Sequence, residues 1–175
     1  MKAFTWKEAF EDALEGAKLG KLPYQTFVGY CYDNGRGVRR DVQKAVSWYE
    51  KAALNKYPDA MFNLAIMCAK GRGTQRNASR AFELYKEAAR KGHLQAETNL
   101  AVMYLDGNGV SQDVAEGLRW LRKAARRGDE KAQYNLGRAY LVGEGLRKNE
   151  SHAKSWLSRA ANAGNIKARR LLKSL

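Results

Sequence analysis

The sequence is short of several residue types, and each shortage excludes a class of protein. Two cysteines in 175 residues, Cys31 and Cys68, cannot form the disulfide framework of a small secreted domain. Two prolines argue against a β-sandwich or a proline-rich linker protein. No run of about 18 consecutive apolar residues is present, so no segment is predicted to span a membrane. The N-terminal stretch is charged and lacks the apolar core of a signal peptide, and we therefore expect a cytoplasmic protein.

Acidic residues are also scarce relative to basic ones. The chain has 32 lysine and arginine residues against 18 aspartate and glutamate residues, which gives a formal net charge of +14. Such an excess indicates an anionic partner, although it says little about the fold. The apolar fraction of 45% is ordinary for a soluble folded protein, and the length is sufficient for one domain with its own core.

Motifs of catalysis are almost absent. Ser151 and Lys154 fit the Ser-x-x-Lys spacing of penicillin-recognising serine enzymes, but the other two elements of that signature are missing. The two histidines, His93 and His152, fall at unrelated places, and no cysteine or histidine spacing fits a metal site. No glycine-rich phosphate-binding motif follows a predicted strand. We therefore predict a protein that is not an enzyme and that uses no cofactor or metal.

What the chain does contain is an internal repeat. Its Gly-x-Gly pairs begin at Gly35, Gly71, Gly107 and Gly143, each 36 residues after the one before. Three further landmarks keep this period: Ala-Ala pairs at 52, 88, 124 and 160; Val28, Leu64, Leu100 and Leu136; and Trp48, Leu84, Trp120 and Trp156. A fixed period of this length indicates stacked structural units. We expect the repeat tryptophans to be core residues.

Each 36-residue unit is predicted to be a pair of helices. In the second copy, the first helix runs from about Ala60 to Ala69 and ends at the Gly-x-Gly segment, where glycine accepts the left-handed conformation. The second helix begins near Asn77, whose side chain can cap the free backbone N–H groups. The prediction is an all-α fold: an α/α superhelical solenoid of four 36-residue helix-turn-helix repeats with half-repeat caps.

The whole chain, residues 1–175, is predicted to be a single repeat domain. Its four repeats are assigned to residues 24–59, 60–95, 96–131 and 132–167. Residues 1–23 are assigned to an N-terminal capping helix and residues 168–175 to a truncated C-terminal helix. Atypical ends of this kind are expected, because the outer face of a terminal unit meets water.

These landmarks resemble those of the Sel1-like repeat family, a relative of the tetratricopeptide repeats. The family pattern runs through Ala, Leu-Gly, Tyr, Gly-x-Gly-Val, Asp, Lys-Ala, Trp-Tyr and Ala-Ala, and the third and fourth copies follow it almost throughout. Tyr24 stands where Ala is usual in the first copy, and Thr74 stands where Val is usual in the second. The resemblance implies a scaffold that binds proteins or peptides, often in bacterial signalling, virulence and envelope processes.

The first helix of each repeat carries the candidate binding residues. At about 100° per residue, Ala60, Leu64, Met67 and Cys68 share the buried side, and other positions face away from it. In tetratricopeptide-like solenoids the first helix lines the concave face, which implies a groove with these side chains: Phe27, Tyr30, Asn63, Ile66, Asn99, Val102, Asn135 and Arg138. An asparagine amide both donates and accepts, so the three asparagines are predicted to hold the backbone of an extended peptide. The alternative is that asparagine merely tolerates an exposed position or bonds a neighbouring repeat.

Basic residues gather in the Gly-x-Gly turns, which stacking should bring to one edge. The predicted basic ridge comprises Arg36, Arg39, Arg40, Lys70, Arg72, Arg76, Arg147 and Lys148. We therefore predict a monomeric scaffold that binds an acidic protein or extended peptide, as a signalling adaptor or as an immunity-type protein that neutralises a toxin. Single-stranded nucleic acid is the alternative partner, less favoured because aromatics suited to base stacking occur mainly in the first repeat.

Overall fold

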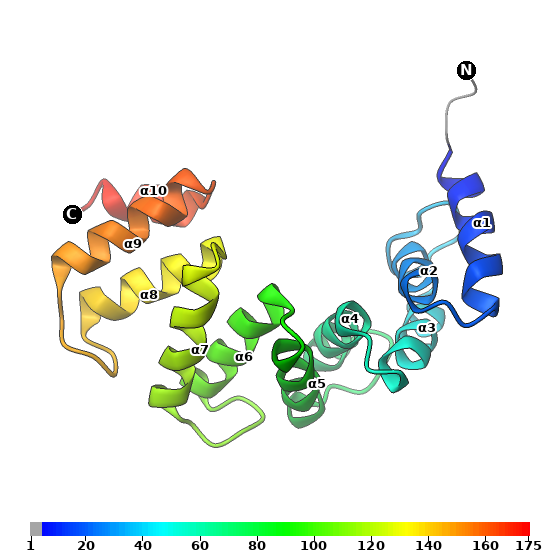
Figure 1. The fold of residues 1–175 in the computed structure, drawn as a ribbon, viewed down its shortest axis with the longest axis horizontal. Coiled ribbons are helices and arrows are strands. Elements are labelled where there is room, and N and C mark those ends of the chain that lie inside the picture. The colour runs from blue at the N-terminus through cyan, green and yellow to red at the C-terminus, as the bar shows by residue number, and fades with distance from the viewer. Residues whose placement is uncertain (1–4) are drawn as a thin grey trace. The chain divides into compact units, whose positions relative to one another are not determined.

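The computed structural model describes residues 5–175, so residues 1–4 of the predicted capping helix lie outside the part that it describes. Ten helices follow one another through residues 5–175. Figure 1 labels them in chain order. Their bounds are α1 Trp6–Lys18, α2 Leu22–Asn34, α3 Val42–Leu54, α4 Pro58–Lys70, α5 Ala78–Arg90, α6 Leu94–Asp106, α7 Val114–Arg126, α8 Glu130–Val142, α9 Glu150–Asn162 and α10 Ile166–Leu172. Residues 5–175 contain no strand, which confirms the predicted all-α class. The chain divides into two compact units, one with α1–α5 up to Lys91 and one with α6–α10 from Gly92.

Local signals set the ends of the helices. The second helix of each repeat begins behind a side chain that accepts a hydrogen bond from the backbone N–H three residues later: Asp41, Asn77, Asp113 or Asn149. Each first helix ends at a glycine with a positive φ, such as Gly35 at 67°. Helix α4 begins at Pro58, two residues before the predicted start, because proline fits the first helical turn, where its missing N–H has no partner to lose.

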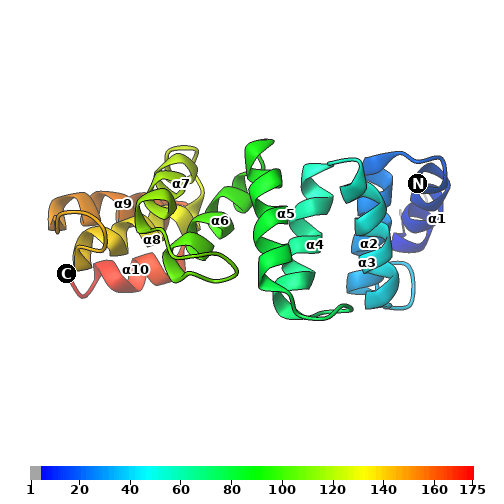
Figure 2. The same cartoon turned by 90° about the horizontal axis from the view of Figure 1, so that it is seen from below.

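The core of each repeat lies between its two helices. Helices α4 and α5 lie side by side in both views of the fold (Figures 1 and 2). The predicted inner face of α4, with Ala60, Leu64, Met67 and Cys68, is buried. Burial of such apolar faces supplies most of the stability of helices that are only 13 residues long.

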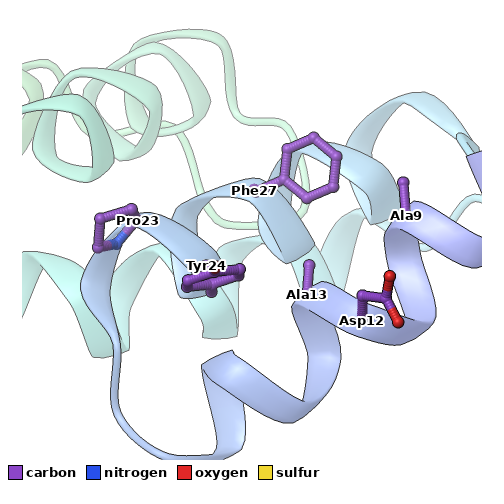
Figure 3. A pocket seen from close by; sticks show the side chains of 6 residues that line it. All are labelled: Ala9, Asp12, Ala13, Pro23, Tyr24 and Phe27. Carbon is purple, nitrogen blue, oxygen red and sulfur yellow. The ribbon is translucent and has the colours of Figure 1, made fainter.

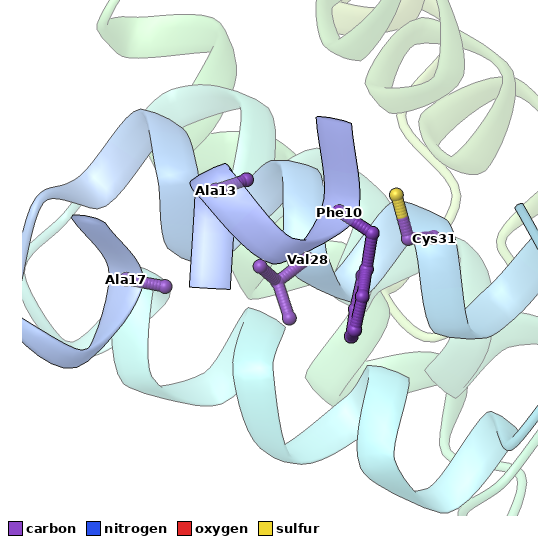
Figure 4. Packing of buried hydrophobic residues seen from close by; sticks show 5 residues of the cluster. All are labelled: Phe10, Ala13, Ala17, Val28 and Cys31. Atoms are coloured by element: carbon purple, nitrogen blue, oxygen red, sulfur yellow. The ribbon is translucent and has the colours of Figure 1, made fainter. Parts of the chain in front are cut away.

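Helix α1 closes the core of the first unit at its N-terminal side. Its residues Phe10, Ala13 and Ala17 pack against Val28 and Cys31 of α2 (Figure 4). The helix starts at a capping box, in which the Thr5 side chain accepts from the Glu8 backbone N–H and the Glu8 carboxylate accepts from the Thr5 backbone N–H. The first helix of the chain is therefore fixed by its own cap as well as by the core.

The tryptophan positions lie at the margin of the core. Trp120 is buried, whereas Trp48 and Trp156 are half-buried, and Trp48 packs against the core cluster of the first unit; the prediction of core tryptophans therefore holds in full only for Trp120. A lysine covers the outer ring face of Trp48, with Lys51 Nζ at 4.4 Å from the ring centre. The next residue along each second helix fills the core instead: Tyr49, Tyr85, Leu121 and Leu157.

Candidate partner-binding site

Aromatic side chains form the predicted binding face of the first repeat. The rings of Phe27 and Tyr30 lie 6.3 Å apart on α2, and Trp6 of α1 joins them at 6.3 Å from Phe27 and 6.4 Å from Tyr30. The Arg36 guanidinium lies over the Trp6 ring, 5.3 Å from its centre. Trp6 is 45% exposed and Tyr30 is 39% exposed, so this patch offers flat apolar surface with a cation at its edge.

Trp6 is a member of this patch that the sequence reading missed. Its neighbour Thr5 stands 36 residues before Asp41, the N-cap of α3, so the repeat register already placed Trp6 at the start of a second helix. That register signal could have placed Trp6 beside the next first helix.

The three predicted ladder asparagines are half-buried on their helices. Asn63, Asn99 and Asn135 form no side-chain hydrogen bond with any other described residue of 5–175. Their amides are therefore not occupied by a neighbouring repeat, which removes one of the two alternatives to a binding role. Ile66, one turn from Asn63 on α4, is also half-buried.

Three of the predicted residues of the second unit line one pocket. Val102 of α6 and Asn135 and Arg138 of α8 border a pocket of about 170 Å³, together with Leu105, Asp106, Ala139 and Glu144. The setting of Arg138 is therefore mixed in charge. Glu144, the middle residue of the last Gly-x-Gly turn, was not predicted to take part. A pocket that joins a guanidinium, an amide and two carboxylates can both donate to and accept from a polar ligand.

A second pocket of this unit also uses Asn135. It has a volume of about 400 Å³ and lies between α8 and α10, where Tyr134 and Ile166 supply apolar lining and Lys131 a positive charge. Ile166 is 63% exposed. Asn135 therefore borders two pockets of this unit.

The predicted basic ridge is only partly free. Arg72 forms an ion pair with Asp33, and the Arg40 Nε–H donates to the Asp33 backbone oxygen at 2.9 Å. Gln112 makes the equivalent bond in the third repeat, where its Nε2–H donates to the Leu105 backbone oxygen at 2.6 Å. In these two repeats the side chain therefore ties the turn to the end of the preceding helix. The ridge residues that are exposed besides Arg40 are Arg36, Arg39, Lys70, Arg76, Arg147 and Lys148.

The two cysteines are buried, and one of the two histidines caps a helix. Burial raises the pKa of the Cys31 and Cys68 thiols, which favours their protonated form. His93 caps α6, with its Nδ1 accepting the Ala96 backbone N–H at 3.2 Å. Within residues 5–175 no three histidine, cysteine or acidic side chains are grouped to hold a metal ion. No helix in the same stretch has the length and apolar character needed to cross a membrane.

Comparison with known structures finds the same helix pairs elsewhere. A Sel1 repeat protein from Oxalobacter formigenes matches with a TM-score of 0.91 at 30% identity, over 96% of this chain and 67% of that one. The protein c5321, a protective antigen present in uropathogenic Escherichia coli strains, matches with a TM-score of 0.86 at 36% identity. That match covers 91% of this chain and 34% of c5321.

Sequence comparison gives the same answer over most of the chain. The chain is 45% identical over 49 residues to the chitin synthase regulator SKT5 of Saccharomyces cerevisiae. The aligned segment makes up 28% of this chain and 7% of the regulator. The chain therefore corresponds to a small part of that relative. The Sel1 repeat model matches four consecutive segments, residues 23–57, 58–93, 94–129 and 130–165. With its helix pairs, glycine-ended first helices and capped second helices, the chain belongs to the Sel1 repeat family.

Proposed function

We propose that the chain is a non-catalytic scaffold that binds an acidic protein or an extended peptide through the outward faces of its first helices. Sel1 repeat proteins are generally scaffolds for protein–protein interaction. The observation that carries the proposal is the pocket lined by Val102, Asn135 and Arg138, in which the Asn135 amide has no partner among residues 5–175. An unoccupied amide beside a guanidinium suits the alternating donors and acceptors of a peptide backbone.

The size of this pocket favours a peptide side chain over a cofactor. Its volume is about 170 Å³. Pockets for small molecules and cofactors are usually about 300–1,000 Å³ and largely apolar. A pocket below that range fits one side chain of a ligand that continues along the surface. The aromatic patch of Trp6, Phe27 and Tyr30 would anchor an apolar residue in the first unit.

Charge supplies the preference for an acidic partner. The net charge of +14 and the exposed turn residues, such as Arg39 and Arg76, would attract an anionic surface over roughly a Debye length, about 8 Å at physiological salt. Asp106 and Glu144 in the pocket would then select among acidic partners by rejecting a carboxylate placed against them. We assign the protein to the bacterial cytoplasm as a monomeric adaptor in signalling or virulence, or as an immunity-type protein.

The test compares affinity with folding. The partner is isolated with the wild-type chain as bait and its affinity is then measured for Asn99→Ala/Asn135→Ala and for Arg138→Ala. We expect a loss of affinity of about tenfold or more at an unchanged melting temperature, which is the size of effect seen when an energetically important interface residue is truncated. The matched control is Asn162→Ala, an exposed asparagine of α9 outside both pockets of this unit.

Two results would contradict the proposal. Full affinity in both variants would remove the role of the first-helix faces. Tight binding to homopolymeric RNA, with log affinity falling linearly with log salt, would instead assign the basic turns to nucleic acid.

A further inference from the structure

Helix α1 is a second helix by register, yet it departs from the others where they pack most tightly. In α3 and α9 a large core side chain lies against a glycine of the first helix of the same repeat. A Cβ added to Gly29 would lie 2.7 Å from the Tyr49 ring, and one added to Gly137 would lie 2.7 Å from Leu157. The residue in this register of α1 is Ala13, 36 residues before Tyr49. The large side chain that fills the helix pair elsewhere is therefore missing from α1.

The neighbouring position of α1 is changed as well. Asp12 stands in the register that holds Trp48 in the first repeat, 36 residues later, and Trp120 and Trp156 in the third and fourth. Two adjacent replacements, one of a large core residue by alanine and one of a tryptophan by aspartate, leave this face of α1 small and charged. Among residues 5–175, α1 packs extensively only against α2.

Helix α2 carries a change in the opposite direction, from a small residue to a large one. Tyr24 occupies the register of the fully buried Ala60, and Gly16 of α1 occupies the register of Ala52. The Tyr24 ring lies over Gly16, where an added Cβ would come 2.8 Å from the ring. The ring is 43% exposed and stands as a wall beside α1.

Together these exchanges open a pocket of about 440 Å³ between α1 and α2 (Figure 3). One side is formed by Ala9, Asp12 and Ala13 of α1, and the other by Pro23, Tyr24 and Phe27 of α2. The Asp12 carboxylate forms no ion pair with any residue from 5 to 175. It is one of four carboxylates on α1, which has only two lysines, although the chain as a whole is strongly basic.

We propose that this pocket, the α1–α2 slot, binds an amphipathic helix of a protein partner that places a bulky apolar side chain over Ala13 and a lysine or arginine against Asp12. The register supplies the shape of the occupant, because the same face of the other second helices packs against a helix. The Ala13 exchange leaves room for a large side chain, and the exposed Asp12 carboxylate, which has no ion-pair partner among residues 5–175, favours a cation beside it. A helix laid in an apolar groove through a few anchor residues is a common mode of recognition.

This site differs in polarity from the groove proposed above. The first-helix faces and the turns would take an acidic protein, whereas the α1–α2 slot takes a basic helix. The aromatic patch borders the slot through Phe27 and adds apolar surface for the occupant. Phe27 belongs to both the aromatic patch and the slot, so a helix in the slot would compete for that patch, while the pockets and turns of the second unit would remain available to an acidic partner.

The probe is a fluorescein-labelled peptide with the sequence of residues 131–142, in which Gly137→Leu supplies the bulky residue. This segment is a first helix, and it carries Lys131 and Arg138 but no acidic side chain. The native sequence with Gly137 is the matched control peptide. We expect the Gly137→Leu peptide to bind the full chain at least about tenfold more tightly, because filling an apolar pocket with a few methylene groups commonly has an effect of that size.

Three variants of the full chain test the slot. Asp12→Trp restores the residue of the first, third and fourth repeats and fills the slot, so it should lower the affinity for the Gly137→Leu peptide about tenfold or more. Asp12→Asn should weaken binding by a smaller factor and reduce its salt dependence. Glu11→Trp places the same bulk on the same helix at an exposed position that does not line the slot, and it should leave the affinity unchanged.

Hydrogen exchange identifies where the peptide binds. Slower amide exchange in α1 and α2 on binding supports the proposal. Equal affinity for the two peptides, or unchanged affinity in Asp12→Trp, overturns it. Protection confined to α9 would mean that the peptide replaces α8, which also overturns it. Sedimentation that shows self-association of the wild-type chain, together with loss of that association in Asp12→Trp, would overturn the assignment to another protein.

Discussion

The ring of Tyr49 lies directly against the backbone of Gly29, and this contact sets how closely α2 and α3 approach. A Cβ at Gly29 would lie 2.7 Å from Tyr49 Cε1 and 2.8 Å from Cδ1, distances that real Cβ atoms do not reach. The next repeat has Ala65 in the register of Gly29 and Tyr85 in that of Tyr49. An alanine–tyrosine pair is therefore compatible with the repeat, but only with a different ring position or helix separation.

The first prediction follows for Gly29→Ala. We expect the free energy of unfolding to fall by about 1–2 kcal/mol, since overpacking costs about 1–3 kcal/mol and the better helix propensity of alanine returns up to about 1 kcal/mol. Urea denaturation, monitored by circular dichroism, measures this change in the free energy of unfolding. The second variant, Gly29→Ala/Tyr49→Leu, recreates the pairing of Ala101 with Leu121 in the third repeat and should recover part of the loss. A stabilised Gly29→Ala protein would show that the Tyr49 ring is not held in place.

The second prediction concerns Lys56, which has a φ of 55° and is the one described residue other than glycine with a positive φ. Glycine occupies the same register at Gly20, Gly92, Gly128 and Gly164. Lys56→Gly should raise the free energy of unfolding by about 0.5–1 kcal/mol, since the left-handed penalty of about 1–2 kcal/mol exceeds the entropy that glycine adds to the unfolded chain.

Differential scanning calorimetry would detect this gain as a rise in melting temperature of up to about 4 °C. The control is Lys91→Gly, because Lys91 has a φ of −83° and gains nothing from glycine. An equal gain in both variants would mean that removing a positive charge, and not relieving backbone strain, is the cause.

Signals that act within a few residues were readable from the sequence. Asn77 caps α5 and Gly35 ends α2 because a side-chain oxygen or a missing Cβ satisfies a local requirement of the backbone. The period of 36 residues then transfers each such assignment to every copy. Fold class and helix order follow from these local rules without knowledge of the contacts between helices.

Contacts that depend on side-chain volume were not readable. Trp48 and Tyr49 are adjacent aromatic residues about 100° apart on the helix, and only packing against Gly29 decides that the tyrosine is the one fully enclosed. The α1–α2 slot has the same origin, since it depends on Ala13 being small where its helix meets α2. Glu144 lines its pocket because of the backbone conformation of the last Gly-x-Gly turn, and the repeat period does not predict that conformation.

The third prediction concerns a buried carboxylate that carries two cations. Glu97 is fully buried, and Lys123 Nζ and Arg127 Nη1 both lie 2.8 Å from its Oε1. Either cation alone still compensates the buried charge, so Lys123→Ala and Arg127→Ala should each cost about 1 kcal/mol. The double variant leaves the carboxylate unpaired and should cost about 3–5 kcal/mol, more than the sum of the two.

A double-mutant cycle by chemical denaturation measures that coupling. Glu97→Gln in the double variant should recover stability, because Gln25 and Gln133 hold the same register and donate to the backbone oxygens of Ala17 and Ala125. Strict additivity of the single variants would contradict the shared role of the two cations.

The fourth prediction is a dependence of stability on alkaline pH. Burial raises the pKa of the Tyr49 phenol above its usual value of 10.0, and the negative charge of Asp33 adds to the effect. Above pH 10 the unfolded chain releases this proton while the folded chain keeps it, so the unfolded state binds fewer protons and stability falls as pH rises. The contribution is complete below pH 10 and is lost from there upward, at no more than about 1.4 kcal/mol per pH unit.

Tyr49→Phe removes the phenol and should therefore flatten the fall in stability between about pH 10 and 11.5. Denaturation midpoints at several pH values give both slopes, and lysine deprotonation contributes equally to the two proteins. Tyr30→Phe, at an exposed tyrosine of α2, is the control and should keep the wild-type slope. A Tyr49→Phe protein with the wild-type slope would contradict the prediction. It would mean that the Tyr49 phenol loses its proton in the folded protein as readily as in the unfolded chain.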